Sequence, residues 1–306
     1  MKTPFIKKKL ACWLCAIVFL WVFGFMTIMS FAQRQMLIDT HQEGLQILAN
    51  EKANLVNTYL ESQQEKYSIL ASMNVFKELA KDPTNSTRVD EARKRINELK
   101  SIFPGIALLS KEGLIIIAES NPAGTDYSGV PGFPANDEST FRFMPYYDQF
   151  RKKDYYGAMG PIYDRVDTTK VIGVIGFDIE IDNVSSLMEE TVDSATNEVY
   201  LIDQTGLLLS GSEFIGQGNK AGILIQEVDS EEAKVCLADL KEYGQENSIE
   251  EHEEKISSPY KNYMGDDVFG SHAYVPSIMG CVIAEESVNE VSSISMLDYF
   301  NNLFIK

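Results

Sequence analysis

The feature that most constrains this chain is an apolar run of 22 residues without a charge, from Leu10 to Phe31. At a helical rise of about 1.5 Å per residue the run extends about 33 Å, enough to cross a hydrocarbon core of about 30 Å. Four lysines precede it: Lys2, Lys7, Lys8 and Lys9. Because positive flanks stay on the cytoplasmic side, we predict a cytoplasmic stub over 1–9, a transmembrane helix over 10–31 and an extracytoplasmic body.

A cleaved signal peptide is the alternative to an uncleaved anchor. Ser30-Phe31-Ala32 is a small-x-small triplet that a signal peptidase accepts. Two bulky residues within the run, Trp13 and Trp21, favour the anchor. The run is also longer than the apolar region of about 7–15 residues that is usual in signal peptides. We therefore expect a single-pass protein of the inner or plasma membrane.

The rest of the chain is acidic. Of its 306 residues, 45 are Asp or Glu and 27 are Lys or Arg, which gives a net charge of -18. After residue 9 only 23 bases face the 45 acids, a net charge of -22. Binding to nucleic-acid phosphates requires clustered Lys and Arg, so the composition excludes a nucleic-acid partner. With 44% hydrophobic and 24% charged residues, the body has the composition of a globular protein.

A long stalk helix is predicted over 32–80, because residues 33 to 79 contain no Pro and only one Gly. Its apolar residues recur at helical spacing: Leu45, Leu48, Leu55, Tyr59, Ile69, Met73 and Phe76. Lys52, Ser62 and Lys66 interrupt the seam, so it is not a clean coiled coil. Packing on the chain's own domain explains the distal half of the stripe well and the proximal half poorly. We therefore expect the proximal stalk to join two chains in a homodimer.

The body after the stalk contains a pattern that occurs twice. After Asp82-Pro83 and a short helix over 88–100, residues 106–109 and 114–117 read as a β-hairpin around Gly113. Residues 198–202 and 207–210 repeat this hairpin around Gly206, 93 residues later. A second echo relates residues 171–187 to residues 280–294, each an apolar strand that turns acidic and ends in Val-Ser-Ser. The repetition predicts an α+β fold with two tandem antiparallel-sheet units, over 81–195 and 196–291, and a tail over 292–306.

This layout resembles a double Cache sensor domain, the extracytoplasmic PAS-like module of prokaryotic chemoreceptors and sensor kinases. The matching elements are the membrane helix, the stalk and four short segments: Phe103-Pro104-Gly105-Ile106, residues 173–179, residues 199–203 and residues 282–287. The resemblance covers nearly all of the chain after residue 32. It implies that the membrane-distal unit holds a small ligand and that binding shifts the stalk helices to signal across the membrane.

The variable middle of the distal unit, residues 126–164, is dense in aromatic residues and holds several basic ones. We predict that a pocket for an amino acid, organic acid or amine is lined by Asp178, Tyr146, Tyr147, Arg142, Tyr156 and Phe141. The aromatic pair and the Asp follow the resemblance to amino-acid-binding relatives. Met144 stands where those relatives carry an Arg. The alternative is that these aromatics form core, that Asp178 pairs locally and that 151–153 is a solvated loop or helix end.

The sequence contains no recognisable catalytic motif, so we expect neither an enzyme nor a cofactor. Its three histidines, His41, His252 and His272, are far apart in the chain, and the acidic run over 250–254 reads as a solvated loop. Cys236 and Cys281 either form a disulfide in an oxidising compartment or remain buried thiols.

The output of such a sensor requires a second membrane helix or a partner. Residues 292–306 are too short and too polar to span a membrane. We therefore expect either an anchored sensor that acts through a separate membrane partner or the front half of a chemoreceptor or kinase. A further alternative is an anchored binding or scaffold module without a signalling role.

Overall fold

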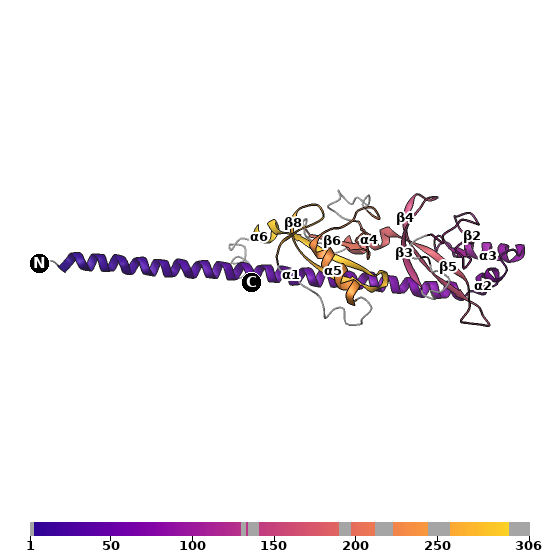
Figure 1. Ribbon diagram of the computed structural model, residues 1–306, viewed down its shortest axis with the longest axis horizontal. Helices are drawn as coiled ribbons and strands as arrows, with labels where there is room; N and C mark the ends of the chain where they lie inside the picture. The colour runs from indigo at the N-terminus through magenta and orange to yellow at the C-terminus, as the bar shows by residue number, and fades with distance from the viewer. Residues whose placement is uncertain are drawn as a thin grey trace.

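The computed structural model describes residues 3–129, 133, 141–189, 197–211, 223–243 and 258–293. One very long helix runs along two antiparallel sheets that lie one after the other, as Figure 1 shows. The expected α+β fold with two tandem sheet units is confirmed. The unit with the five-stranded sheet is called the distal unit, because it lies farther from the N-terminal end of the long helix. The unit with the four-stranded sheet is called the proximal unit.

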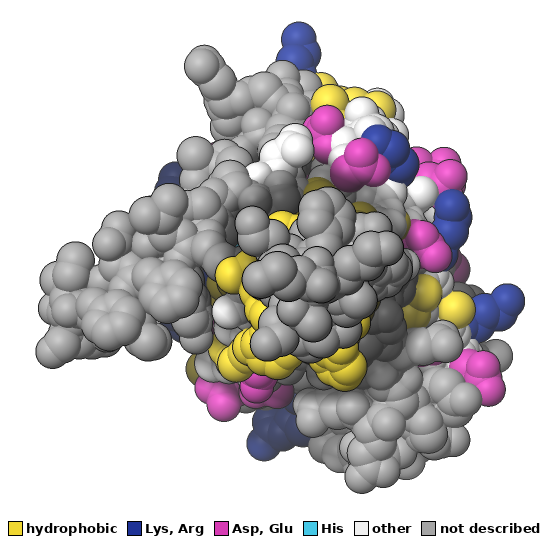
Figure 2. Space-filling view, turned by 90° about the vertical axis from the view of Figure 1, so that its left-hand side faces the viewer, with side chains coloured by type: hydrophobic (Ala, Val, Ile, Leu, Met, Phe, Trp, Pro, Cys, Tyr) yellow, Lys and Arg dark blue, Asp and Glu magenta, His cyan; other side chains and the backbone are white. Residues whose placement is uncertain are grey.

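Helix α1 spans Thr3–Ser72, 70 residues without interruption, so it extends about 105 Å. Its N-terminal part stands clear of both sheets (Figure 1), and from Ile17 to Phe31 it exposes large apolar side chains, with Trp21 77% exposed. The helix is long and apolar enough at this end to cross a membrane. Viewed from this end, apolar side chains gather around the axis of α1 and charged ones lie toward the rim (Figure 2).

The prediction of one unbroken helix over 32–80 is wrong in one detail. Helix α1 ends at Ser72, and a separate helix α2 spans Asn74–Lys81. Between them Met73 has an extended backbone, with φ -68° and ψ 123°. After this break, α2 packs on α3 and on strands β1 and β5 of the distal unit, with Phe76 and Leu79 fully buried.

The buried face of α1 recurs in steps of three and four along both sheets. Its members are Leu45, Ala49, Lys52, Val56, Leu60, Gln63, Tyr67 and Leu70. The first of these pack on strands of the proximal sheet and the last on the distal sheet. The expectation that the proximal half packs poorly on its own domain is therefore wrong. Small residues such as Ala49 and Ala53 allow the helix to lie close to the sheet, a signal that the count of large apolar residues missed.

The distal unit begins with helix α3, whose first turn is capped by Asn85 through a hydrogen bond from the backbone N–H of Arg88. Its elements are α3 (Ser86–Leu99), β1 (Ala107–Leu109), β2 (Ile115–Ala118), β3 (Arg142–Asp148), β4 (Lys153–Tyr163), β5 (Val171–Glu180) and α4 (Ile181–Glu189). The strand order is β2-β1-β5-β4-β3, with all neighbours antiparallel. The first predicted hairpin is confirmed as β1 and β2.

The proximal unit has a sheet of order β6-β9-β8-β7. Its elements are β6 (Asn197–Ile202), α5 (Glu231–Tyr243), β7 (Tyr260–Lys261), β8 (Asp267–Val275), η3 (Pro276–Ile278), β9 (Gly280–Ser287) and α6 (Val288–Ser293). The second predicted hairpin is only partly formed. Leu207 and Leu208 make isolated bridges rather than a strand, because Leu207 pairs with Glu227 and Leu208 with Ile202.

The internal repeat is visible in the turns. Gly113 and Gly206 both have a positive φ, +93° and +85°, which favours glycine. Three residues before each glycine a side-chain oxygen accepts a backbone N–H, Ser110 from Leu114 at 3.4 Å and Asp203 from Leu207 at 3.0 Å. The second echo also holds, because β5 leads directly into α4 and β9 into α6.

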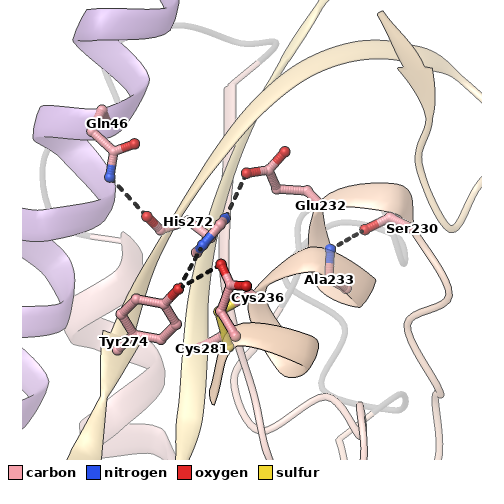
Figure 3. Close-up of a disulfide and its surroundings, with 9 residues drawn as sticks. Gln46, Ser230, Glu232, Ala233, Cys236, His272, Tyr274 and Cys281 are labelled. Carbon is pink, nitrogen blue, oxygen red and sulfur yellow. Dashed lines mark hydrogen bonds and ion pairs between the residues drawn. A yellow bond between two sulfur atoms is a disulfide. The ribbon is translucent and has the colours of Figure 1, made fainter. Parts of the chain in front are cut away.

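A disulfide closes the proximal unit. Cys236 on α5 and Cys281 on β9 are joined, with an S–S distance of 2.04 Å, as Figure 3 shows. The bond clamps α5 to the sheet on the face opposite α1, so the proximal sheet lies between two helices (Figure 3).

Candidate ligand-binding site

A small cavity lies in the distal unit between the hairpin β1–β2 and the strands β3 to β5. Its volume is about 20 Å³, and most of its walls are small or apolar residues. The polar lining consists of Ser120, Asn121, Tyr127, Tyr146, Arg151 and Asp178. Apolar walls with a few converging polar groups are typical of small-molecule sites.

Asp178 is the central acidic group. It lies on β5, is only 6% exposed, and its backbone N–H donates to the carbonyl of Pro104 at 2.7 Å. The Tyr146 hydroxyl donates to Asp178 Oδ1 at 2.6 Å. Gly105 lies against the carboxylate so closely that a Cβ on it would overlap Asp178 Oδ2. The backbone around the cavity therefore holds this carboxylate in one position.

Arg151 supplies the positive charge of the site. It lies in the turn after β3, donates to Asp178 Oδ2 and stacks its guanidinium 4.0 Å above the centre of the Tyr155 ring. Asp148 fixes this turn, because its buried carboxylate accepts from the backbone N–H of Phe150 and from both the backbone and Nε of Arg151. The carboxylates of Asp148 and Asp178 and the Tyr155 ring thus orient the guanidinium in the absence of a ligand.

The electrostatics of the cavity follow from burial. Burial raises the pKa of Asp178 to about 6, although Arg151 and Tyr146 favour its ionised form. Burial and the neighbouring Asp178 raise the pKa of Tyr146, so its hydroxyl keeps its proton and remains a donor. At neutral pH the site therefore presents a carboxylate and a guanidinium side by side.

Asn121 contributes an acceptor that is not used by the described part of the chain. Its Nδ2 donates to the Tyr127 hydroxyl at 2.5 Å, whereas its buried Oδ1 has no hydrogen-bond partner within the described residues. A buried carbonyl oxygen of this kind normally has a partner.

Two of the six predicted site residues, Asp178 and Tyr146, line the cavity. Tyr147 does not, because neighbouring residues of a strand face opposite sides, and it is 55% exposed. Arg142, at the start of β3, is not among the lining residues, and Phe141 instead stacks on Tyr67 of α1 with ring centres 4.6 Å apart.

Tyr156 is the fourth predicted site residue that lies elsewhere. It points from β4 to the opposite face of the distal sheet, where its hydroxyl donates to the carbonyl of Leu209 at 2.9 Å. It therefore joins the distal unit to the proximal unit rather than contacting the cavity.

Sequence reasoning missed Arg151, Tyr127 and Asn121. The alternative interpretation made 151–153 a solvated loop or helix end, and Lys153 does form surface ion pairs with Glu180 and Asp182. A signal for Arg151 was present in Asp148-Gln-Phe-Arg151, since an Asp three residues before an Arg suits a side-chain-capped turn. No comparable signal marks Asn121, which reaches the cavity only through the fold.

No metal site is formed by the residues that the structure describes, among which no group of three His, Cys, Asp or Glu could hold an ion. His41 pairs with Glu286 and His272 with Glu232, at separate places in the proximal unit. His252 and the acidic run 250–254, like the tail from residue 294 onward, lie outside the described residues.

Comparisons with known proteins place this geometry in a family. The family model of the Cache domain matches residues 33–292. No curated protein matches the sequence. Among solved structures, the sensor domain of the histidine kinase DctB of V. cholerae is 12% identical with a TM-score of 0.58, over 83% of this chain and 98% of that one.

Two further structures are chemoreceptor ligand-binding domains with an amino acid bound. That of CtaA from Pseudomonas fluorescens with L-isoleucine is 17% identical with a TM-score of 0.56, over 87% of this chain and all of that one. That of Tlp3 from Campylobacter jejuni with 4-methylisoleucine is 15% identical with a TM-score of 0.55, over 84% and 94%. The chain therefore belongs to the Cache domain family, with the double Cache fold of chemoreceptor and histidine kinase sensor domains.

Proposed function

We propose that this protein is a membrane-anchored extracytoplasmic sensor that binds a small metabolite with an amino group in the distal cavity. The observation that carries the proposal is the pairing of Asp178 with Tyr146 at the wall of the cavity, beside the Asn121 Oδ1 acceptor, which has no partner among the described residues. A carboxylate and a carbonyl oxygen are acceptors that suit an ammonium group.

An α-amino acid is the ligand class that fits both charges. Its ammonium group would bond to Asp178 and its carboxylate to Arg151. Arg151 would thus replace the Arg that the amino-acid-binding relatives carry at the position of Met144. Met144 itself is only 2% exposed and packs in the apolar cluster beside the cavity. The amino acids in the CtaA and Tlp3 structures support this class of ligand.

The volume of about 20 Å³ is water-sized, so a ligand requires that Arg151 move away from Asp178. Exchange of the internal ion pair for two ion pairs with a zwitterion keeps both buried charges compensated. We infer that release of Arg151 is the first conformational consequence of binding.

The proposed anchor is the apolar end of α1, with the lysine-rich stub in the cytoplasm and both sheet units outside. Continuity of α1 from the membrane to Ser72 gives a rigid connection between the ligand unit and the bilayer. A signal would reach a membrane partner, or a second copy of the chain, through this helix.

The test is a thermal-shift and calorimetric screen of the full chain in detergent against amino acids, organic acids and amines. We expect stabilisation by at least one amine-bearing compound. Asp178→Asn should weaken its binding by about 30-fold or more, since loss of one partner of a buried charge pair costs about 2–5 kcal/mol.

The control is Asp90→Asn, which removes an exposed carboxylate on α3 whose only described contact is a surface ion pair with Arg93. It should leave the affinity unchanged. Equal affinity of Asp178→Asn and the wild type would refute the assignment of the site. Stabilisation only by acids without an amine would refute the ligand class.

A further inference from the structure

The distal site has a counterpart in the proximal unit, built at the same register. In the distal sheet Asp178 on β5 lies opposite Gly157 on β4. Two residues along β4, Tyr155 lies opposite Tyr146 of the edge strand β3, and the Tyr146 hydroxyl reaches back to Asp178.

In the proximal sheet Glu285 on β9 lies opposite Gly270 on β8. Two residues along β8, Val268 lies opposite Tyr260 of the edge strand β7, and the Tyr260 hydroxyl donates to Glu285 Oε1 at 2.8 Å. Carboxylate, glycine and tyrosine thus occupy equivalent positions in both units. The proximal unit has therefore kept the acidic wall of the ligand site.

The two carboxylates differ in their compensation. Asp178 bonds to Arg151, whereas no Lys or Arg bonds to Glu285 within the described part of the chain. Glu285 is fully buried, and its Oε2 has no hydrogen-bond partner among those residues. Tyr260 fills the space above Gly270 so closely that a Cβ there would lie 1.9 Å from its hydroxyl oxygen. This position is packed too tightly for a metabolite.

The groups around Glu285 are mostly acidic. Its direct partner on β6 is Glu198, which is 2% exposed and accepts from the Tyr263 hydroxyl at 2.9 Å. Tyr200 of β6 is also fully buried beside it. Helix α5 contributes Glu232, which acts on both Glu285 and Tyr260, and Glu231, which acts on Tyr260.

Within the described ranges, His272 of β8 is the basic residue that bonds to this cluster, and its Nδ1 lies 2.7 Å from Glu232 Oε1. Figure 3 shows its ring pointing toward α5, while its backbone carbonyl accepts from Gln46 of α1 on the other side. This imidazole bonds to Glu232 and not to Glu285, so among the described residues no basic side chain bonds to Glu285. A buried carboxylate without a counter-charge is costly, so protonation is the route to neutrality.

We propose that the proximal unit binds a proton at Glu285 and that this proton makes the sensor respond to external pH. The direction of the titration agrees with the geometry. Burial above all, together with the nearby Glu198 and Glu232, raises the pKa of Glu285 to about 8, while the hydroxyls of Tyr260 and Tyr200 act in the opposite direction. Glu285 is therefore neutral below this pH and gives its proton to solvent above it.

We expect the conformational change to be transmitted to α1 through Glu286, the residue that follows Glu285. Glu286 faces the opposite side of β9, where its Oε2 lies 2.8 Å from Nδ1 of His41 on α1. A negative charge on Glu285 repels Glu198 on the neighbouring strand and weakens the pairing of β6 with β9. Movement of β9 changes its contact with α1 where that helix leaves the body toward its apolar end.

The first test is a pH titration of the full chain in detergent, read by the infrared carbonyl band of protonated carboxyl groups. We expect a band that disappears with a midpoint near pH 8 and is absent in Glu285→Gln. The control Glu242→Gln, at an exposed position of α5, should retain it. Persistence of the band in Glu285→Gln, or no protonated carboxyl group between pH 6 and pH 8, would overturn the proposal.

A second variant guards against loss of folding in Glu285→Gln. Tyr260→Phe removes the hydroxyl that favours the ionised carboxylate, so the midpoint should rise. A merely structural tyrosine would lower stability without moving the midpoint.

The conformational change in α1 is measured by amide hydrogen exchange, corrected for the intrinsic pH dependence. Residues 38–45 of α1 should exchange faster at pH 9 than at pH 6 in the wild type, and equal protection at both values would refute the link to α1. No ligand is present, so failure here leaves the distal site untouched.

Discussion

Substitution of Tyr156 by Phe tests how the two units are held together. The Tyr156 ring is 1% exposed, and its hydroxyl bonds to the carbonyl of Leu209, a residue that is fully buried. The change keeps the ring and removes one donor. The hydrogen bond itself contributes about 1 kcal/mol, and the stranded carbonyl adds about 1 kcal/mol because water cannot replace the donor. We expect a loss of about 2 kcal/mol in the free energy of unfolding.

The assay is urea unfolding of the full chain in detergent, followed by circular dichroism. Tyr147→Phe is the matched control, because that tyrosine is 55% exposed on the neighbouring strand, and its effect should stay within about 0.5 kcal/mol. Ligand affinity should be unchanged in Tyr156→Phe, since the residue faces away from the cavity. A loss no larger than that of the control, or a loss of ligand binding without a loss of stability, would refute this assignment.

Three further predictions concern the site, the disulfide and α1. Gly105→Ala should weaken ligand binding more than Gly124→Ala, as measured by calorimetry: both glycines have a positive φ, but only at the first would a Cβ overlap Asp178. Cys281→Ser should lower stability by about 2–4 kcal/mol in chemical denaturation, because the disulfide closes a loop over a separation of 45 residues. Ile47→Cys, at a position of α1 that is 61% exposed, should crosslink two chains if the proposed homodimer forms through this helix, and non-reducing electrophoresis measures this.

Most of the architecture could be predicted from the sequence, because short-range sequence patterns determine its helices, strands and turns. The apolar run, the absence of Pro along α1 and the repeated glycine turns each act over a few residues. Gly113 and Gly206 needed the same positive φ in both units, and that requirement is visible in the sequence alone. The order of these elements along the chain then indicated the resemblance to the double Cache family.

The side on which α1 packs was not predictable in this way. The sequence marked Leu45 as a candidate for contact between two chains, yet it is 3% exposed against the chain's own proximal sheet. Helical spacing shows that a face is apolar, but it contains no information about which surface covers it. The small residues Ala49 and Ala53, which permit close approach to the sheet, carry little weight in a hydropathy pattern.

The sequence by itself determined the fold class and the acidic residue of the candidate site, Asp178. Only the tertiary structure decided the rest of the site, because its members come from segments far apart in the chain. Strand alternation placed Tyr146 inside and Tyr147 outside, and the turn held by Asp148 brought Arg151 to the carboxylate. Hydrogen bonds and burial depend on distances in space, which residue spacing along a chain does not specify.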